Sequence, residues 1–256
     1  VDVNKIAGLD NFCWPDPIES EKTPDGKFKL AQLVRANREL ERICRAYRLP
    51  CVSGKDSMKN DYGKGADKIS IPPTLLFSLF GDHPDVRNTA TSDFKNVGDK
   101  IYLVGESHEE LGASEVSFML KENGTVAGIG GKVPALSDPE KLFKSYNSLS
   151  SAINSGLVKT AHDCSEGGLG VTLAEMCIGG RIGASIDLDG TGDCTLWSRL
   201  WGESLGRIVV AVSQENEQKF LDKMTGSKTT FLGTVDDTDV LTITDGFESV
   251  ISTKVQ

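Results

Sequence analysis

The most constraining feature of this chain is a short glycine-rich segment, residues 161–170, which reads AHDCSEGGLG. An apolar run from Val171 to Ile178 follows at once, so the order indicates a strand ending in Asp163, a turn, and the start of a helix. Such a site can hold Mg²⁺ on the carboxylate and phosphate oxygens on the N–H groups of the turn. An ordinary glycine turn with Asp163 as a cap fits the spacing equally well, and both interpretations stay open.

The composition narrows the classes of partner. The 256 residues carry a net charge of −9, which argues against nucleic acid as a partner, because phosphate backbones demand a surplus of Lys and Arg. No apolar run approaches the roughly 18 residues that span a bilayer, and the first residues, beginning at Val1, do not resemble a signal peptide. We therefore expect a cytoplasmic protein without a membrane partner. Because the first residue is not Met, we also expect a fragment or a processed product.

The cysteines indicate thiols rather than a zinc site. None of them forms a C-x-x-C pair, and the chain has 3 histidines, so zinc is not expected. Without a secretion signal they are typical of reduced cytosolic thiols. The 6 cysteines are Cys13, Cys44, Cys51, Cys164, Cys177 and Cys194.

Apolar spacing and turn residues predict an α/β fold in two regions. In the first region, residues 9–27 are expected to be irregular, and a helix runs from Phe28 until Pro50 ends it. Further predicted segments are a short strand at 51–52 that leads into a loop at 53–57, and strand formers at 69–80. The polar stretch 89–99 marks the boundary. Beyond it we predict strands at 100–104, 159–162, 184–188, 207–212, 231–235 and 240–244, a helix that begins at Asp138-Pro139, and a helix capped by Ser213 that runs through Met224.

Four polar features leave alternatives open. The loop 53–57, SGKDS, could contact a phosphate or be a solvated turn. The two carboxylates of segment 9–17, LDNFCWPDP, could flank a metal or a base, or the segment could simply pack its aromatic rings onto the domain. Segment 202–207, GESLGR, predicts a tight turn with a structural ion pair, although Glu203 or Arg207 could touch a ligand. His162 could act as a base, but alternate strand residues face opposite ways, so we expect it to face away from Asp163.

Four motifs in order carry a resemblance to a known family. They are DNFCWPDP at 10–17, PCVSGKDSMK at 50–59, IPPT at 71–74 and HDCSEGGL at 162–169. Together they resemble the C-terminal half of the synthetase part of phosphoribosylformylglycinamidine synthase, an enzyme of purine biosynthesis. The resemblance covers essentially the whole chain.

The resemblance implies an architecture shared with aminoimidazole ribonucleotide synthase and selenophosphate synthetase. Residues 1–95 would be the latter part of the second barrel-forming domain, and residues 96–256 the α/β flanking domain. The early strands of the barrel-forming piece would be missing, which predicts an exposed sheet edge or apolar face. The partners implied are the missing N-terminal half of the synthetase, a glutaminase domain or subunit, and a small phosphorylated substrate.

The implied reaction is that of a carbon–nitrogen ligase with glutamine as amido donor. ATP phosphorylates the formylglycinamide amide oxygen, and ammonia displaces phosphate from the resulting iminophosphate to give the amidine. Mg²⁺ would neutralise phosphate charge. The family's catalytic histidine and several metal ligands would lie upstream, so no catalytic residue is assigned here and the fragment alone should be inactive.

Site residues follow only where the motifs match. By resemblance, Asp163 is a Mg²⁺ ligand, and Ser57 contacts the substrate phosphate. By the same resemblance, the nucleotide is contacted by Asp10, Gly54 and Ser165. Lys55 stands where shorter family members have a metal-binding Asn. A charged ammonium cannot ligate Mg²⁺, so a phosphate or salt-bridge role is expected, on the substrate side.

Two other functions compete with this one. The chain could be a non-catalytic scaffold or a structural nucleotide-binding half of the same enzyme. It could also belong to another ATP-dependent member of the superfamily, such as selenophosphate synthetase or a hydrogenase-maturation enzyme. The motifs WPDP at 14–17 and GKDS at 54–57 argue against this last alternative.

Overall fold

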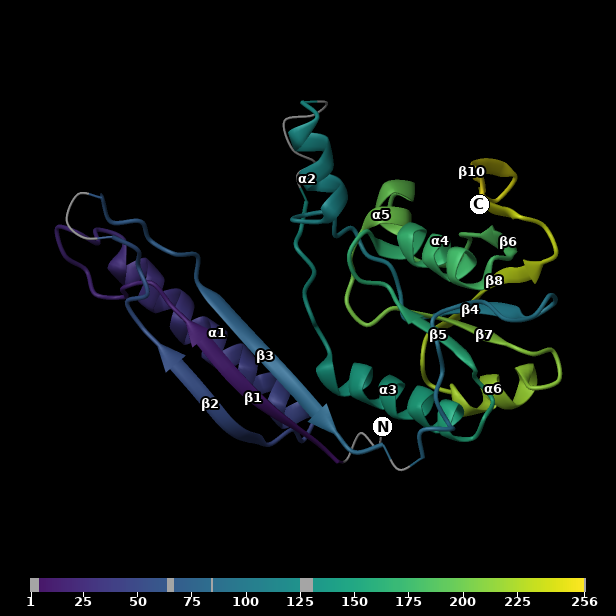
Figure 1. Ribbon diagram of the computed structural model, residues 1–256, viewed down its shortest axis with the longest axis horizontal. Coiled ribbons are helices and arrows are strands. Elements are labelled where there is room, and N and C mark those ends of the chain that lie inside the picture. Colours follow the sequence, from purple (N-terminus) through teal and green to yellow (C-terminus); the bar gives the residue numbers. More distant parts are fainter. Residues whose placement is uncertain (1–4, 64–66, 84, 125–130, 256) are drawn as a thin grey trace. The chain divides into compact units, whose positions relative to one another are not determined.

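The chain divides into two compact units, Val1–Pro84 and Asp85–Gln256. The computed structural model describes residues 5–63, 67–83, 85–124 and 131–255 (Figure 1). Residues 85–95 pack with the second unit, since the N–H of Thr91 donates to the carbonyl of Lys159 and that of Phe94 to the carbonyl of Met176. The boundary between the two units along the chain therefore falls between Pro84 and Asp85. Among the helices of the described residues, none is long and apolar enough to cross a membrane.

The first unit is a three-stranded sheet with one long helix. Its strand order is β2-β1-β3, with β2 parallel and β3 antiparallel to the central β1. The elements are β1 (Ile6–Cys13), α1 (Gly26–Ala46), β2 (Cys51–Ser57) and β3 (Thr74–Gly81). Helix α1 lies along the sheet (Figure 1), and Leu40 and Ile43 line an apolar groove with Phe77 of β3. The predicted helix is confirmed.

Two expectations for this unit are wrong. Residues 9–13 are not irregular but belong to the central strand β1, and the predicted loop at 53–57 is the body of β2. Both stretches are polar and lack the alternation typical of a half-buried strand. Here the backbone hydrogen bonds of the sheet fix the conformation, while nearly every residue of β2 is exposed.

Large apolar side chains are exposed on the sheet of this unit. Four large apolar side chains on β2 and β3 are more than half exposed: Val52, Leu76, Leu79 and Phe80. Alternation places Leu79 on the α1 side of the sheet, with Phe77, and Leu76 and Phe80 on the opposite side.

The second unit is built on a seven-stranded sheet of order β10-β9-β6-β8-β4-β7-β5. Its strands are β4 (Lys100–Val104), β5 (Thr160–Asp163), β6 (Gly183–Asp187), β7 (Ile208–Val212), β8 (Thr229–Asp236), β9 (Val240–Asp245) and β10 (Glu248–Lys254). Its helices are α2 (Glu115–Glu122), α3 (Pro139–Asn154), α4 (Gly168–Gly180), α5 (Leu196–Trp201) and α6 (Glu217–Lys223). The predicted α/β class is confirmed.

Strand alternation gives this sheet two cores. In β4, Ile101 and Leu103 join the core under α4 and α5, while Tyr102 and Val104 join the core under α3 and α6. Successive residues of a strand point to opposite faces. The residues of β7 divide in the same way. The sequences of β4 and β7 are therefore almost continuously apolar.

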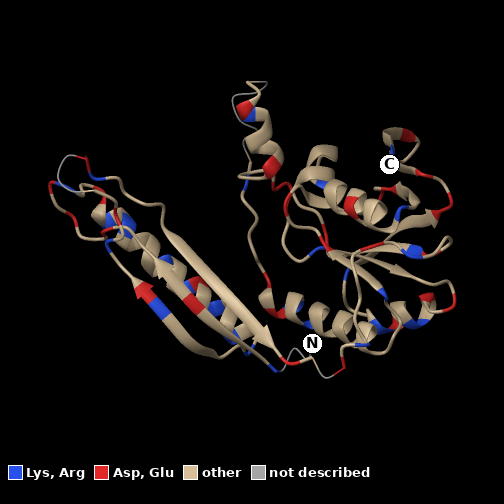
Figure 2. Cartoon of the chain, in the orientation of Figure 1, with Lys and Arg blue, Asp and Glu red and all other residues tan. Residues whose placement is uncertain are grey.

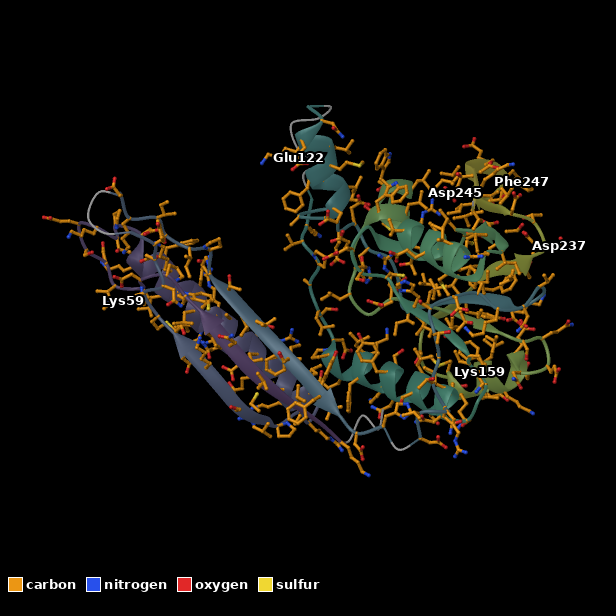
Figure 3. All side chains as sticks on the ribbon, viewed as in Figure 1. Lys59, Glu122, Lys159, Asp237, Asp245 and Phe247 are labelled. Carbon is orange, nitrogen blue, oxygen red and sulfur yellow. The ribbon has the colours of Figure 1, made fainter. Side chains whose placement is uncertain are left out.

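Several local expectations for the second unit can be judged directly. Asp138 caps α3, because its Oδ1 accepts the N–H of Lys141 at 2.8 Å, as predicted. Ser213 does not cap a helix: a turn closed by the Asn216 N–H and the Ser213 carbonyl comes first, and α6 follows it. Strand β10 and the short helices α2 and α5 were not predicted. Asp245 is the last residue of β9 (Figure 3). Helix α5 is tied to it by Arg199, whose guanidinium donates to both carboxylate oxygens of Asp245, at 2.8 and 2.6 Å.

Candidate functional site

The glycine-rich segment forms the predicted strand, turn and helix. Strand β5 ends at Asp163 and α4 begins at Gly168. Gly167 and Gly168 have φ of +77° and +66°, values that residues with a Cβ rarely adopt. A Cβ on Gly168 would also stand 2.5 Å from the carbonyl oxygen of Gly202. Glycine is therefore required at this position by conformation and by space.

Two oxygen-bearing side chains meet at the end of β5. The side chain of Asp163 is 71% exposed, and its Oδ2 accepts a 2.9 Å hydrogen bond from Oγ of the exposed Ser165. Below them, Thr172 Oγ1 donates to the backbone carbonyl of Asp163 at 3.1 Å. The structure thus brings the two site residues predicted in this unit together, with a carboxylate open to solvent.

The expectation for His162 is wrong. Its Nδ1 lies 3.4 Å from Oδ1 of Asp163, and its Nε2 lies 3.1 Å from Oε2 of Glu175 on α4. Asp163 is the last residue of β5 and pairs with Ile208 of β7, so the contact forms between neighbouring side chains at the end of the strand. The negative charge of Asp163 reaches Tyr146 as well, where burial and then this charge raise the pKa of the phenol.

Glu203 has a role that sequence reasoning missed. Its Oε1 accepts the N–H of Gly167 at 3.0 Å and the N–H of Glu115 at 2.9 Å. The N–H of Gly168 donates to the carbonyl of Ser165 at 3.0 Å. Two of the turn's N–H groups expected to hold phosphate oxygens are therefore already bonded, one of them to a carboxylate of the protein itself. The one sequence signal for this contact is the acidic side chain in the segment GESLGR, because the N–H groups that it accepts belong to residues far away in sequence.

Arg207 is structural, as expected, but not through an ion pair with Glu203. It is 1% exposed, and its guanidinium donates to Ser107 Oγ at 2.9 Å, to the carbonyl of Ser204 at 3.3 Å and to the carbonyl of Gly202. Burial lowers the pKa of this group. The two charged residues of the turn thus hold different parts of the backbone.

In the first unit, Asp10 and Gly54 face each other across two strands. They are register partners in β1 and β2, and a Cβ on Gly54 would stand 2.5 Å from Oδ1 of Asp10. Phe77, the partner of Asp10 on β3, lines the groove beside α1. The two predicted nucleotide contacts therefore lie together on the α1 side of the sheet.

Lys55 and Ser57 lie on the other face of the same strand. Alternation places them opposite to Gly54, and their register partners in β1 are Asn11 and Cys13. The structure therefore separates the predicted substrate contacts from the predicted nucleotide contacts by the thickness of the sheet.

The fit to Mg²⁺ rests on a single carboxylate in the second unit. Among the described residues, no group of three or more His, Cys, Asp and Glu side chains could hold a metal ion. Mg²⁺ commonly binds one or two protein carboxylates and completes its shell with water and substrate phosphates. The exposed Asp163 fits that mode, and it does not fit an all-protein cage.

Charged residues of both signs occur along the described elements of each unit. Figure 2 shows acidic and basic residues interspersed along the elements of each unit. The net charge of the chain is −9, whereas nucleic-acid-binding domains typically carry a surplus of basic residues.

Comparison with known proteins finds sequence relatives for most of the chain. Residues 96–246 match the family model of the AIR synthase related protein, C-terminal domain. Phosphoribosylformylglycinamidine synthase subunit PurL of Deinococcus radiodurans is 33% identical over 218 residues, which cover 83% of this chain and 27% of that protein. The chain thus spans about a quarter of the length of this curated relative.

Solved structures share the fold at lower sequence identity. T. maritima PurL complexed with FGAR matches with a TM-score of 0.68 at 17% identity, over 98% of this chain and 38% of that one. Hydrogenase maturation protein HypE in complex with ATP matches with a TM-score of 0.64 at 12% identity, over 100% of this chain and 76% of that one. Because the family model matches more than half of the chain, the chain belongs to the AIR synthase-related family.

Proposed function

We propose that this chain is the C-terminal part of a phosphoribosylformylglycinamidine synthase and contributes to its ATP-dependent, amidine-forming reaction. The order of the four motifs and the similarity to PurL over most of the chain support this assignment. The observation that carries the nucleotide site is the exposed carboxylate of Asp163, oriented by the hydroxyl of Ser165 at 2.9 Å.

Each residue has a defined task in this proposal. Asp163 holds Mg²⁺, which when bound neutralises charge on the nucleotide phosphates. Ser165 orients that carboxylate and contacts the nucleotide. The glycines of the turn hold both side chains at the end of β5, while Glu203 fixes the N–H of Gly167 and so keeps the turn rigid.

The two faces of the first unit serve different ligands in this proposal. Asp10 and Gly54, on the α1 side, contact nucleotide. Lys55 and Ser57, on the opposite side, take the phosphate of the small substrate, for which an ammonium and a hydroxyl are suitable donors. A single small ligand does not contact both faces of one sheet, so the separation supports two roles.

The chain works with further protein in this proposal. The iminophosphate chemistry needs groups that the family carries upstream, and ammonia comes from glutamine on a glutaminase domain or subunit. We expect the chain alone to bind Mg²⁺-nucleotide weakly and to turn over little or no substrate.

One observation favours a second candidate, a structural half that does not handle phosphate transfer. The carboxylate of Glu203 occupies the N–H of Gly167 at the start of α4, where a helix would otherwise attract a phosphate. A scaffold or structural nucleotide site tolerates such an internal anion more easily than a site that must exchange phosphates.

Calorimetric titration with ADP and ATP, with and without Mg²⁺, tests the proposal. Asp163→Asn should abolish the magnesium-dependent part of binding. Asp237→Asn removes another exposed carboxylate, directly after β8 (Figure 3), and should bind as wild type does. Equal binding by wild type and Asp163→Asn would overturn the metal role. Absence of binding by the folded chain and by the full-length protein would favour the scaffold.

A further inference from the structure

Two cysteine sulfurs lie in contact in the first unit. Sγ of Cys44, in the last turns of α1, is 3.7 Å from Sγ of Cys51, the first residue of β2. Both thiols are free. A disulfide needs the two sulfurs about 2.0 Å apart, so side-chain rotation and a small adjustment separate this contact from a bond.

The backbone between the two cysteines is fixed. The N–H of Leu49 donates to the carbonyl of Cys44 at 2.8 Å and the N–H of Arg48 to that of Arg45 at 3.2 Å, with Arg48 in the left-handed region at φ +52°. This double hydrogen bond is the Schellman motif that terminates helices. The buried Leu49 holds the end of the motif, so the helix end reaches the strand by a defined path.

The strand side of the pair is fixed as well. The carbonyl of Pro50 accepts the N–H of Gly8 at 2.9 Å, and Gly8 is the register partner of Cys51. Between the two anchored segments the chain has little freedom. The sulfur contact is therefore a property of the fold rather than of two mobile side chains.

The two thiols are not equivalent. Cys51 is exposed, whereas Cys44 is half-buried. Burial, the contact with Cys51 and the charge of Asp10 raise the pKa of Cys44 to about 11. Since the thiolate is the attacking species, a reagent from solution meets Cys51 first and Cys44 only through Cys51.

We propose that Cys44 and Cys51 form a covalent modification site for small-molecule disulfides, which convert the pair into a reversible bridge between α1 and β2. The Cys51 thiolate attacks one sulfur of the small disulfide and releases one small thiolate. The Cys44 sulfur, on losing its proton, attacks Cys51 and releases the second small thiol. Two protein thiols lose two electrons and two protons, and one small disulfide becomes two thiols.

Oxidation of the whole chain with glutathione disulfide tests this site. After alkylation and digestion, we expect the bridged 44–51 peptide to exceed the Cys51–glutathione adduct by about tenfold or more, because the second step is intramolecular. In Cys44→Ser the adduct at Cys51 should become the main product. Cys194→Ser, which replaces a half-buried cysteine of the other unit, should form the bridge as wild type does.

The opposite pattern would remove the proposal. Accumulation of the Cys51 adduct in wild type, with Cys44 still free to react with iodoacetamide, would mean that the sulfurs do not exchange. If Cys44→Ser does not fold, Cys51→Ser gives the second test. In that variant Cys44 should stay unmodified, and modification at the wild-type rate would show that Cys44 reacts without Cys51.

Discussion

The carboxylate of Asp10 lies against the α-carbon of Gly54 on the neighbouring strand, so that an added Cβ would stand 2.5 Å from Oδ1. This contact crosses β1 and β2 at a position where both residues are proposed to meet nucleotide. Only a residue without a side chain leaves the carboxylate in that place.

Gly54→Ala is therefore expected to displace the Asp10 side chain. A carboxylate at the end of a flexible side chain can move, so we expect a cost below about 1 kcal/mol in the free energy of unfolding and a clear loss of ADP affinity by calorimetry. Ser53→Ala, on the same exposed strand, is the control and should leave affinity unchanged. Wild-type affinity in Gly54→Ala would place the nucleotide elsewhere.

Gly168→Ala should destabilise the second unit. The residue combines a φ of +66° with the close carbonyl of Gly202. Gly98→Ala separates these effects, because Gly98 has a φ of +88° and nothing within 4 Å of its added Cβ. We expect about 1 kcal/mol for Gly98→Ala and at least about 3 kcal/mol for Gly168→Ala, measured by urea denaturation. Equal losses would show that the carbonyl contact costs nothing.

Glu203→Ala should loosen the turn at Asp163. Two backbone N–H groups, on Gly167 and Glu115, lose their acceptor, and each lost hydrogen bond to a charged group is worth about 1.5 kcal/mol or more. Glu203→Gln keeps an oxygen acceptor and should lose less than half as much in urea denaturation. If both variants are as stable as wild type, Glu203 does not hold the turn.

Asp61 predicts a pH dependence in the first unit. Its side chain is 4% exposed and meets Lys68 at 2.8 Å, together with the N–H of Asp16 and the hydroxyl of Ser70. Burial raises the pKa of Asp61, but these partners, Lys68 first, outweigh it and hold the pKa below its ordinary value of 3.8.

A lowered pKa stabilises the fold above the unfolded-state value and loses that effect as pH falls through the folded-state value. Asp61→Asn should therefore cost about 2 kcal/mol at pH 7, and the difference should shrink as pH falls below the ordinary value of 3.8 and vanish once Asp61 is protonated in the folded state. Hydrogen exchange of β1 peptides, measured against pH in both proteins, would report this difference in stability. The exposed Asp67→Asn should show no such cost, and a pH-independent difference would assign the effect to packing.

Some of this architecture could be predicted from the sequence because the signals are local. Asp138 followed by Pro139 marks a helix start by the chemistry of the first turn alone, and apolar spacing from Phe28 onward determines α1. The strand before Asp163 and the helix after it are likewise indicated by neighbouring residues.

The remainder depends on contacts between distant segments. Strands β1 and β2 carry Asp10 and Lys55, which no strand pattern favours, and form because their backbones pair with each other. Glu203 reaches a turn 36 residues away, and His162 contacts Glu175 of α4. Such relations follow from tertiary placement rather than from spacing along the chain.

The alternation of Ile101 and Tyr102 in β4 has a consequence for how the second unit unfolds. Strands β4 and β7 each contribute side chains to both cores, so a slip of one residue in either strand would exchange its two sets of side chains and disrupt both cores at once. Neither layer of helices can then detach while the sheet keeps its other core intact. Strands β4 and β7 and the helices that cover them on both sides should accordingly unfold as one cooperative body.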